Sequence, residues 1–367
     1  MDSEGSLRLR ALLVSAICVV LAVVYLVLLR DGLVGFDWFD YLSASRSIVA
    51  GHGAFGEILR LGAERYGSPT APLFVYPPFL AYALIPATVL PWQVGYVLWS
   101  GLSIAALVWA LSLLPRDHPL RQRWWILPAF GPLTFGFLLG QVDILVLAGL
   151  LVALEDRDGT RAGVGLAVAV ILKATPAVFI IELLMRHRWR ALAAGSVAAL
   201  ILAAVGGPAE WQTYLLVLGE LARQPSVTST WQVAPAALGG TLLGLVASGA
   251  CVLAFVASPV APQKDRRLIR GLALGLALTT FPMNAWAHWL TFGLVALFAD
   301  AGTTRLGRYL LMAYLLVGWT VLFVGSVLIL LLDLTTIAVL LVIEGLGLYR
   351  RLRRGTGAAV PLLSSGA

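Results

Sequence analysis

The chain has 367 residues, of which 60% are hydrophobic and 12% charged, and its mean hydropathy is +0.90. Soluble globular domains carry about 25% charged residues, so this composition excludes that class and indicates a polytopic membrane protein. The net charge of +7 does not indicate nucleic-acid binding, because the arginines lie in short clusters between apolar runs, as in cytoplasmic loops that face anionic lipid. Cys18 and Cys251 lie inside apolar runs and predict neither a disulfide framework nor a cysteine metal site.

Apolar runs in chain order predict an all-α fold with about twelve transmembrane helices in a single domain over 1–349, followed by a cytoplasmic tail over 350–367. The first run continues into Leu28-Leu29-Arg30-Asp31 without a small-residue cleavage site, which favours a retained span over a signal peptide. The expected spans are 11–30, 73–90, 94–114, 124–138, 141–154, 162–185, 189–206, 238–258, 271–283, 289–299, 309–325 and 327–348.

Charge places most connections on one side of the membrane. The positive-inside rule assigns these basic clusters, and with them both termini, to the cytoplasm: Arg8/Arg10, Arg186/Arg188/Arg190, Lys264/Arg266/Arg267/Arg270, Arg305/Arg308 and Arg350/Arg351/Arg353/Arg354. Two basic loops conflict with this assignment, because they would lie outside if every run crossed completely: Arg116/Arg121/Arg123 and Arg157/Arg161.

An alternative arrangement makes 73–91 a re-entrant element and breaks 162–185 at Lys173-Ala174-Thr175-Pro176. The prolines that would permit the re-entrant element are Pro77, Pro78, Pro86 and Pro91. Gln141 and Asp143 would then face outside. Both arrangements keep the loops 31–72 and 207–237 outside.

These two outer loops are long and rich in glycine, proline, tryptophan and polar residues, as functional loops on a compact scaffold often are. Helical spacing in the first loop is shown by Phe36, Phe39, Leu42, Ser43 and Arg46. A helix here would bring Asp37, Asp40 and Tyr41 onto one face.

An ordered set of short motifs then runs from about residue 30 to about residue 300. The set consists of Asp37-x-x-x-Tyr41-x-x-Ala44, Gly51, Val75-Tyr76-Pro77-Pro78, Pro86, Trp99, Gly140-Gln141-Val142, Lys173-x-x-Pro176, Arg188-Trp189-Arg190 and Pro282…Trp286-Ala287-His288. In this order the chain resembles the bacterial polyprenyl-phosphate-mannose-dependent mannosyltransferases, which are integral-membrane glycosyltransferases of the GT-C class. It departs from their pattern at Asp143, where asparagine is usual, and at Trp289, where a second histidine is common.

The resemblance implies transfer of a hexose, mannose in the first instance, from a polyprenyl-phosphate carrier to a glycolipid or polysaccharide acceptor. Asp37 matches the family's motif acid and is the expected general base, with Asp40 as the second candidate. Direct displacement with one base would invert the anomeric carbon, unlike the two-carboxylate double displacement of retaining glycosidases.

Further residues are candidates for contact with the donor phosphate or the substrates. A lysine inside an apolar run is costly, so Lys173 is expected to face either the donor phosphate or an acid, and Asp143 and Glu182 are the rival partners. Arginine suits phosphate because its planar fork donates two hydrogen bonds. The full set of candidates is His288, Lys173, Arg60, Arg65, Arg223, Tyr41, Tyr76, Gln141, Trp286 and Trp289.

The sequence contains neither a Gly-x-Gly-x-x-Gly motif after a strand nor a P-loop, so a donor carried by membrane lipid fits better than a soluble nucleotide sugar. No cofactor is required, and dependence on a divalent metal is left open. The expected location is the bacterial cytoplasmic membrane, with the active site on its extracytoplasmic face. Alternatives are an arabinofuranose or glucose donor, a lipid or solute transporter, which would favour inverted repeats that are not evident, and a membrane scaffold.

Overall fold

The structure, a computed structural model, describes residues 34–56, 74–155, 158–223 and 305–319, together with single positions within 9–20, 242–253 and 331–346. Throughout these residues the regular secondary structure is helical and includes no strand, which confirms the all-α expectation. One helix of the described part, α5 (Trp92–Leu113), is by itself long and apolar enough to cross a bilayer. The described residues do not confirm a count of twelve spans, and the runs 11–30, 238–258, 271–283, 289–299 and 327–348 lie outside them or are described only at single positions.

Several expected spans are interrupted where proline or an extended residue breaks the helical hydrogen bonds. The prediction of one continuous span over 73–90 is wrong, because this segment forms two short pieces, α4 (Pro78–Ala83) and η1 (Ile85–Val89). The run 124–138 divides at Phe130 into η2 (Trp124–Ala129) and α7 (Gly131–Leu139). The run 162–185 divides into α9 (Gly159–Leu172), η3 (Thr175–Phe179) and α10 (Ile180–Met185), so the alternative break at Lys173 is confirmed.

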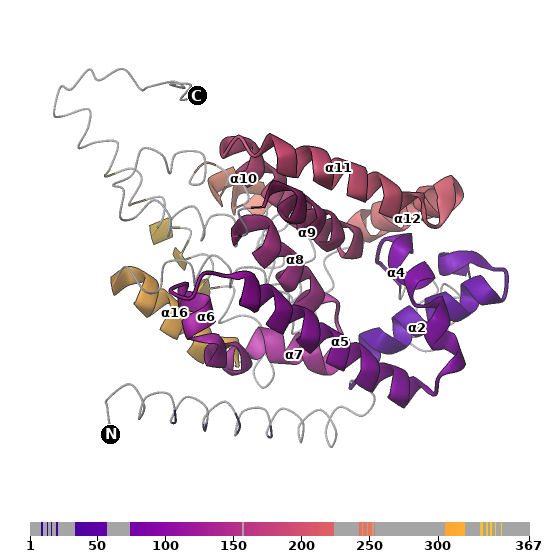
Figure 1. The fold of residues 1–367 in the computed structure, drawn as a ribbon, viewed down its shortest axis with the longest axis horizontal. Coiled ribbons are helices and arrows are strands. Elements are labelled where there is room, and N and C mark those ends of the chain that lie inside the picture. The colour runs from indigo at the N-terminus through magenta and orange to yellow at the C-terminus, as the bar shows by residue number, and fades with distance from the viewer. Residues whose placement is uncertain are drawn as a thin grey trace.

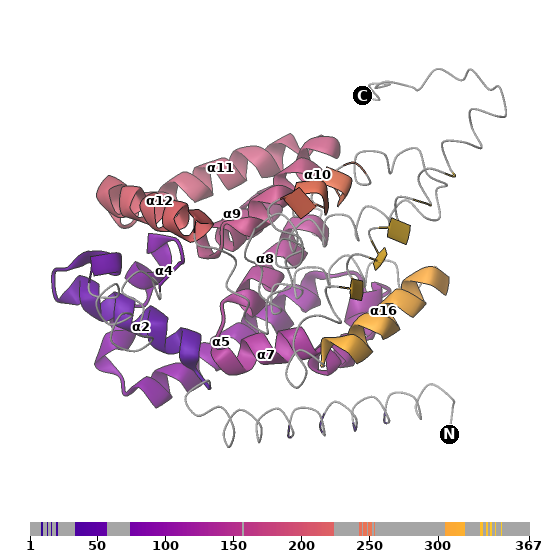
Figure 2. The same cartoon turned by 180° about the vertical axis from the view of Figure 1, so that it is seen from behind.

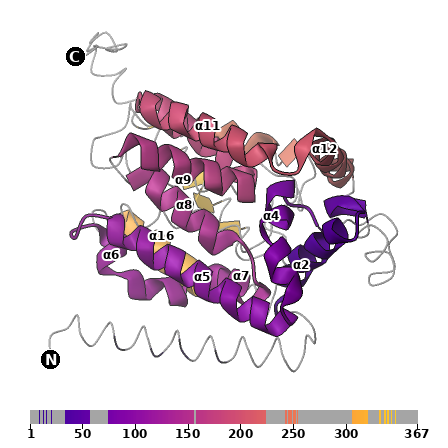
Figure 3. The same ribbon diagram turned by 45° about the vertical axis from the view of Figure 1, so that its right-hand side comes forward.

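The predicted helix in the first loop is present as α2 (Phe36–Val49), and it lies at one end of the longer helices (Figures 1 and 3). Trp38 on α2 donates its indole N–H to the carbonyl of Trp92, at the start of α5, over 3.0 Å. The short helix α4 and the helix α12 (Gly207–Arg223) lie at this same end, which we call the site end.

The opposite end of the helices carries the arginines of the short connections. α5 ends there at Leu113 and continues into α6 (Pro119–Gln122). α8 (Asp143–Glu155) runs to the same end, where Arg188 donates to the carbonyl of Ala153 over 2.8 Å. We call this end the arginine end. Arg121 there donates to the Ser112 carbonyl over 3.1 Å, and a Cβ atom built on Gly159 would lie 2.9 Å from the Cβ of Arg190. The arginines in or next to these connections are Arg116, Arg121, Arg123, Arg161, Arg186, Arg188 and Arg190. The two loops that conflicted with the first span assignment therefore lie with the other arginines, as in the alternative arrangement.

Small residues let three central helices approach closely, as in many membrane proteins. A Cβ atom built on Gly149 of α8 would lie 2.6 Å from the Gly165 carbonyl oxygen of α9. On the other side of α9, a Cβ atom on Gly163 would lie 2.1 Å from the Ala191 carbonyl oxygen of α11 (Trp189–Ala204). α8, α9 and α11 thereby form a layered group between the two ends (Figure 2).

The second outer segment, expected as a loop over 207–237, is helical in its first half. α12 is bent by 97° from α11 and therefore runs across the site end. Both carboxylate oxygens of Glu210 accept from the backbone N–H of Ala54, at 3.1 and 3.2 Å, and Tyr214 stacks on Phe55 at 6.2 Å between ring centroids. The two segments predicted to be outer loops are therefore in direct contact.

At the arginine end, α16 (Arg305–Gly318) packs against α7. The indole N–H of Trp319 donates to the Ala129 carbonyl over 2.7 Å, and Gly318 lies against Gly131. Residues 305–319 thus contact α7 and the residues just before it.

Candidate active site

Asp37 lies in the first turn of α2, where the helix dipole favours a negative charge. The turn before it is fixed by Gly35, which has a φ of 71° and donates its N–H to the Leu138 carbonyl over 2.9 Å. A positive φ suits glycine, so this residue allows α2 to begin directly against the end of α7. The Asp37 side chain is partly exposed. It is therefore anchored on a rigid element and still open to approach.

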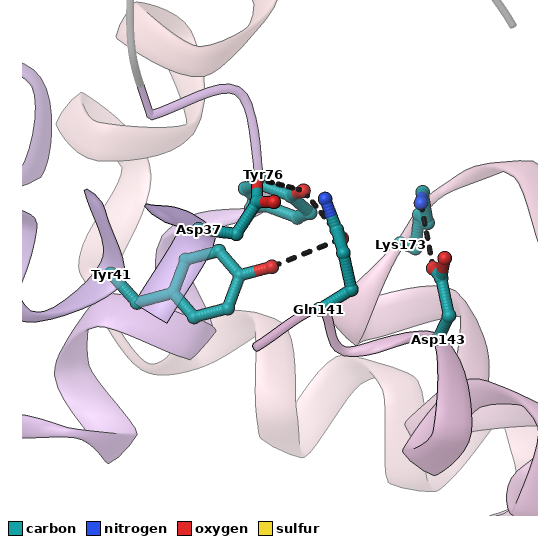
Figure 4. A network of polar contacts seen from close by, with 6 residues as sticks. All are labelled: Asp37, Tyr41, Tyr76, Gln141, Asp143 and Lys173. Atoms are coloured by element: carbon teal, nitrogen blue, oxygen red, sulfur yellow. Dashed lines mark hydrogen bonds and ion pairs between the residues drawn. The ribbon is translucent and has the colours of Figure 1, made fainter. Parts of the chain in front are cut away.

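Two tyrosines and a glutamine surround Asp37 on the protein side (Figure 4). The Tyr41 hydroxyl donates to Gln141 Oε1 over 3.2 Å, and the Tyr76 hydroxyl donates to the same oxygen over 2.8 Å. The Tyr76 hydroxyl also lies 3.5 Å from Asp37 Oδ1. Tyr41, Tyr76 and Gln141 are all buried, so they contact Asp37 from the interior of the protein.

A buried ion pair lies beside this cluster. Lys173 Nζ is 2.8 Å from Asp143 Oδ1 and 6.0 Å from the centre of the Tyr76 ring. Both partners lie at helix boundaries, Asp143 at the start of α8 and Lys173 just after the end of α9. Of the two partners proposed for Lys173, Asp143 is therefore the one observed, whereas Glu182 pairs with Arg186 at the arginine end.

The surroundings of Asp37 favour a carboxyl group that exchanges protons near neutral pH. Desolvation by burial raises the pKa of Asp37 from 3.8 to about 7, an effect that the positive charge of Lys173 opposes. The negative charge of Asp143 adds to the rise, and hydrogen bonding from Gln141 and Tyr76 opposes it. A general base works best when its pKa lies close to the working pH, and Asp37 meets that condition.

The structure brings together five of the proposed site residues, namely Asp37, Tyr41, Tyr76, Gln141 and Lys173. Asp40 is buried on the same helix, at 3% exposure, and its participation stays a prediction. The proposed residues Arg60, Arg65, Trp286, His288 and Trp289 lie outside the described residues, and Arg223 ends α12 with its side chain outside the described part.

Asp143 is the residue of the cluster that sequence reasoning did not place in the site, although it named Asp143 as a rival partner of Lys173. The available signal was its position: an acid two residues after Gln141, at the start of an otherwise apolar run. Among the residues that the structure describes, no group of three or more His, Cys, Asp or Glu side chains is arranged to hold a metal ion.

In the described part of the chain, apolar helices thus carry a polar cluster with a partly exposed carboxylate at the site end. A family model for glycosyltransferase family 87 matches residues 74–271, which is more than half of the chain. The chain belongs to glycosyltransferase family 87.

Two curated relatives are both described as polyprenol-phosphate-mannose-dependent alpha-(1-2)-phosphatidylinositol pentamannoside mannosyltransferase. The protein from Mycolicibacterium smegmatis is 32% identical over 165 residues, which cover 43% of this chain and 38% of the relative. The protein from Mycobacterium tuberculosis is 29% identical over 251 residues, which cover 61% of this chain and 57% of the relative. The chain thus matches less than two thirds of the length of either relative. No solved structure matches the chain.

Proposed function

We propose that this protein transfers mannose from a polyprenyl-phosphate carrier to a glycolipid acceptor, with inversion at the anomeric carbon. The observation that carries the proposal is the cluster around Asp37, in a chain of glycosyltransferase family 87. The two similar mycobacterial proteins support the donor class, because their descriptions name polyprenol-phosphate-mannose as the donor and a phosphatidylinositol mannoside as the acceptor.

In this reaction Asp37 removes the proton from the acceptor hydroxyl while the hydroxyl oxygen attacks the anomeric carbon. The bond between that carbon and the phosphate oxygen breaks on the opposite face, and the polyprenyl phosphate leaves with its negative charge. Lys173, which is paired with Asp143 in the structure, is the cation that we assign to stabilise this charge, at the cost of weakening that pairing. Asp37 is partly exposed, as a base that must meet an acceptor requires.

The distribution of arginines supports one orientation of the protein in the bacterial cytoplasmic membrane. Because cytoplasmic connections are enriched in arginine and lysine, the arginine end faces the cytoplasm and the site end faces outward. The donor then enters laterally from the bilayer, and its phosphate meets Asp37 and Lys173 near the outer surface.

Labelling of single cysteines tests this orientation. In a chain with Cys18 and Cys251 replaced by alanine, we expect Ala50→Cys at the end of α2 to react with a membrane-impermeant maleimide in intact cells. We expect Gln122→Cys in α6 to react only after the cells are opened. Both native residues are exposed, so access within the protein is comparable. The reverse pattern of labelling would contradict the orientation.

The identity of the sugar donor is tested with the full chain in proteoliposomes that contain a mannosylated phosphatidylinositol acceptor. Four labelled donors are supplied separately: polyprenyl-phosphate-mannose, the corresponding glucose and arabinofuranose lipids, and GDP-mannose. Transfer from the mannose lipid alone is the expected result. Transfer from a different lipid would correct the sugar and keep the class, whereas transfer from GDP-mannose alone, or from none of the donors, would overturn the proposal.

A further inference from the structure

Gln141 has both lone pairs of its amide oxygen occupied within the protein. The hydroxyl groups of Tyr41 and Tyr76 lie 3.2 and 2.8 Å from Oε1, and both donate to it. An amide oxygen accepts two hydrogen bonds, so this oxygen has no capacity left for a sugar hydroxyl. With 4% exposure, the side chain is also shielded from an incoming substrate. Gln141 is therefore poorly suited to bind substrate directly.

The same two bonds determine which way the amide group faces. Since both tyrosine hydroxyls donate to the oxygen, the NH₂ group lies on the opposite side of the amide carbon, in the same plane. In Figure 4 the amide nitrogen is turned away from Tyr41, toward the side on which Asp37 and Tyr76 lie. The Tyr76 hydroxyl has a single proton, which is directed to Gln141 because this oxygen is nearer than Asp37 Oδ1, 2.8 Å against 3.5 Å. Besides this longer contact from Tyr76, the amide NH₂ of Gln141 is then a donor to the Asp37 carboxylate.

The backbone at Gln141 is fixed against the helix that carries the base. Gly140 ends α7 with a φ of 78°, and a Cβ atom placed there would lie 2.8 Å from the Cβ of Trp38. The Gly140 carbonyl accepts from the Trp99 indole over 2.9 Å, and the Gln141 N–H donates to the Gly136 carbonyl over 2.9 Å. The distance between Gln141 and α2 is therefore set by close backbone packing.

We propose that Gln141 is a positioning residue for the base, whose amide, locked by two tyrosine hydroxyls, donates to the Asp37 carboxylate and keeps it ionised and aimed at the acceptor. This inference rests on the proposed role of Asp37. Among the residues that the structure describes, the other titratable groups that interact with Asp37 are Lys173, Asp143, Tyr41 and Tyr76, and none of them is itself replaced when Gln141 alone is changed.

The test compares the pH dependence and steady-state constants of transfer from polyprenyl-phosphate-mannose for wild type, Gln141→Leu and Gln141→Glu in proteoliposomes. Gln141→Leu removes the donor, so we expect kcat to fall roughly 10- to 100-fold, the effect of one hydrogen bond to a charged group, with KM little changed. The pH midpoint of kcat should move upward. Gln141→Glu adds a negative charge and should move the midpoint further. Gln212→Leu, at an exposed glutamine of α12, is the matched control and should behave like wild type.

Three results would decide against this role. An increase in KM with an unchanged pH midpoint would make Gln141 a substrate ligand, and unchanged kinetics would give it no role. If Gln141→Leu does not fold, Tyr41→Phe is used, because it removes one of the two hydrogen bonds that hold the Gln141 amide. This variant should shift kcat and the pH midpoint in the same direction by a smaller amount. An unshifted pH midpoint in Tyr41→Phe would also overturn the proposal. An Asp37→Asn variant measured in parallel separates failure of the role of Gln141 from failure of the proposed function. If Asp37→Asn stays active, the proposed function itself fails.

Discussion

Replacing Asp37 with asparagine is expected to lower the rate of mannose transfer by roughly 10²- to 10⁴-fold, the usual contribution of a general base. Asparagine keeps the size of the side chain and the start of α2 but accepts no proton from the acceptor hydroxyl. The rate is measured in proteoliposomes with saturating polyprenyl-phosphate-mannose, and binding of the donor is measured separately. Binding should change little, because the role assigned to Asp37 is in the chemical step.

Two further variants, each with another aspartate changed to asparagine, are measured in the same way to interpret the loss of transfer in Asp37→Asn. Asp117→Asn changes an exposed acid at the arginine end and should leave transfer unchanged. Asp40→Asn changes the buried acid one turn from Asp37 and tests its participation directly. Retention of more than about a tenth of the wild-type rate by Asp37→Asn would rule out the proposed base. Loss in Asp40→Asn alone would transfer the role to that residue.

The second large effect is expected from the buried ion pair of Lys173 and Asp143. Changing Lys173 to methionine leaves the Asp143 carboxylate buried without its cation, which should lower the free energy of unfolding by about 3–5 kcal/mol. Unfolding is followed by thermal and denaturant titration in detergent. The double variant Lys173→Met/Asp143→Leu removes both charges and should regain most of this loss.

An exposed pair gives the control for that measurement. Arg161 and Asp158 lie 3.6 Å apart with side chains 60% and 46% exposed, so Arg161→Met should cost no more than about 1 kcal/mol. Equal losses of unfolding free energy at the two sites would contradict the stabilising role of the buried pair.

Lys173→Met should also move the pH midpoint of transfer upward, because the lysine lowers the pKa of Asp37.

The local features of the site were predictable from sequence because they depend on short-range patterns. Apolar residues at helical spacing predicted α2 around Asp37, and proline at 176 predicted the helix break next to Lys173. The cost of a charge in an apolar run predicted that Lys173 would need an acid. What spacing could not decide was which acid, since Asp143 and Glu182 both lie within the neighbouring runs.

Longer-range features were not predictable in this way. Hydropathy treats 73–90 as one span, although its prolines divide it, and counting it as a crossing reversed the side assigned to Arg116 and Arg161. The contact between Glu210 and Ala54 joins residues 156 positions apart, and no local pattern encodes such a pairing. The helix α12 was missed because glycine and polar residues at its start suggested a loop.

The pH dependence of single-turnover transfer by the wild-type protein tests the central claim most directly. Donor is bound first and excess acceptor is added at a series of pH values, so that the rate reports the chemical step. Because burial raises the pKa of Asp37 to about 7, the base is ionised above that pH and protonated below it. The predicted rate therefore falls about tenfold per pH unit below a midpoint near 7 and reaches a plateau above it. A rate that stays constant from pH 5.5 to 8, or that rises as the pH falls, would contradict general-base catalysis by Asp37.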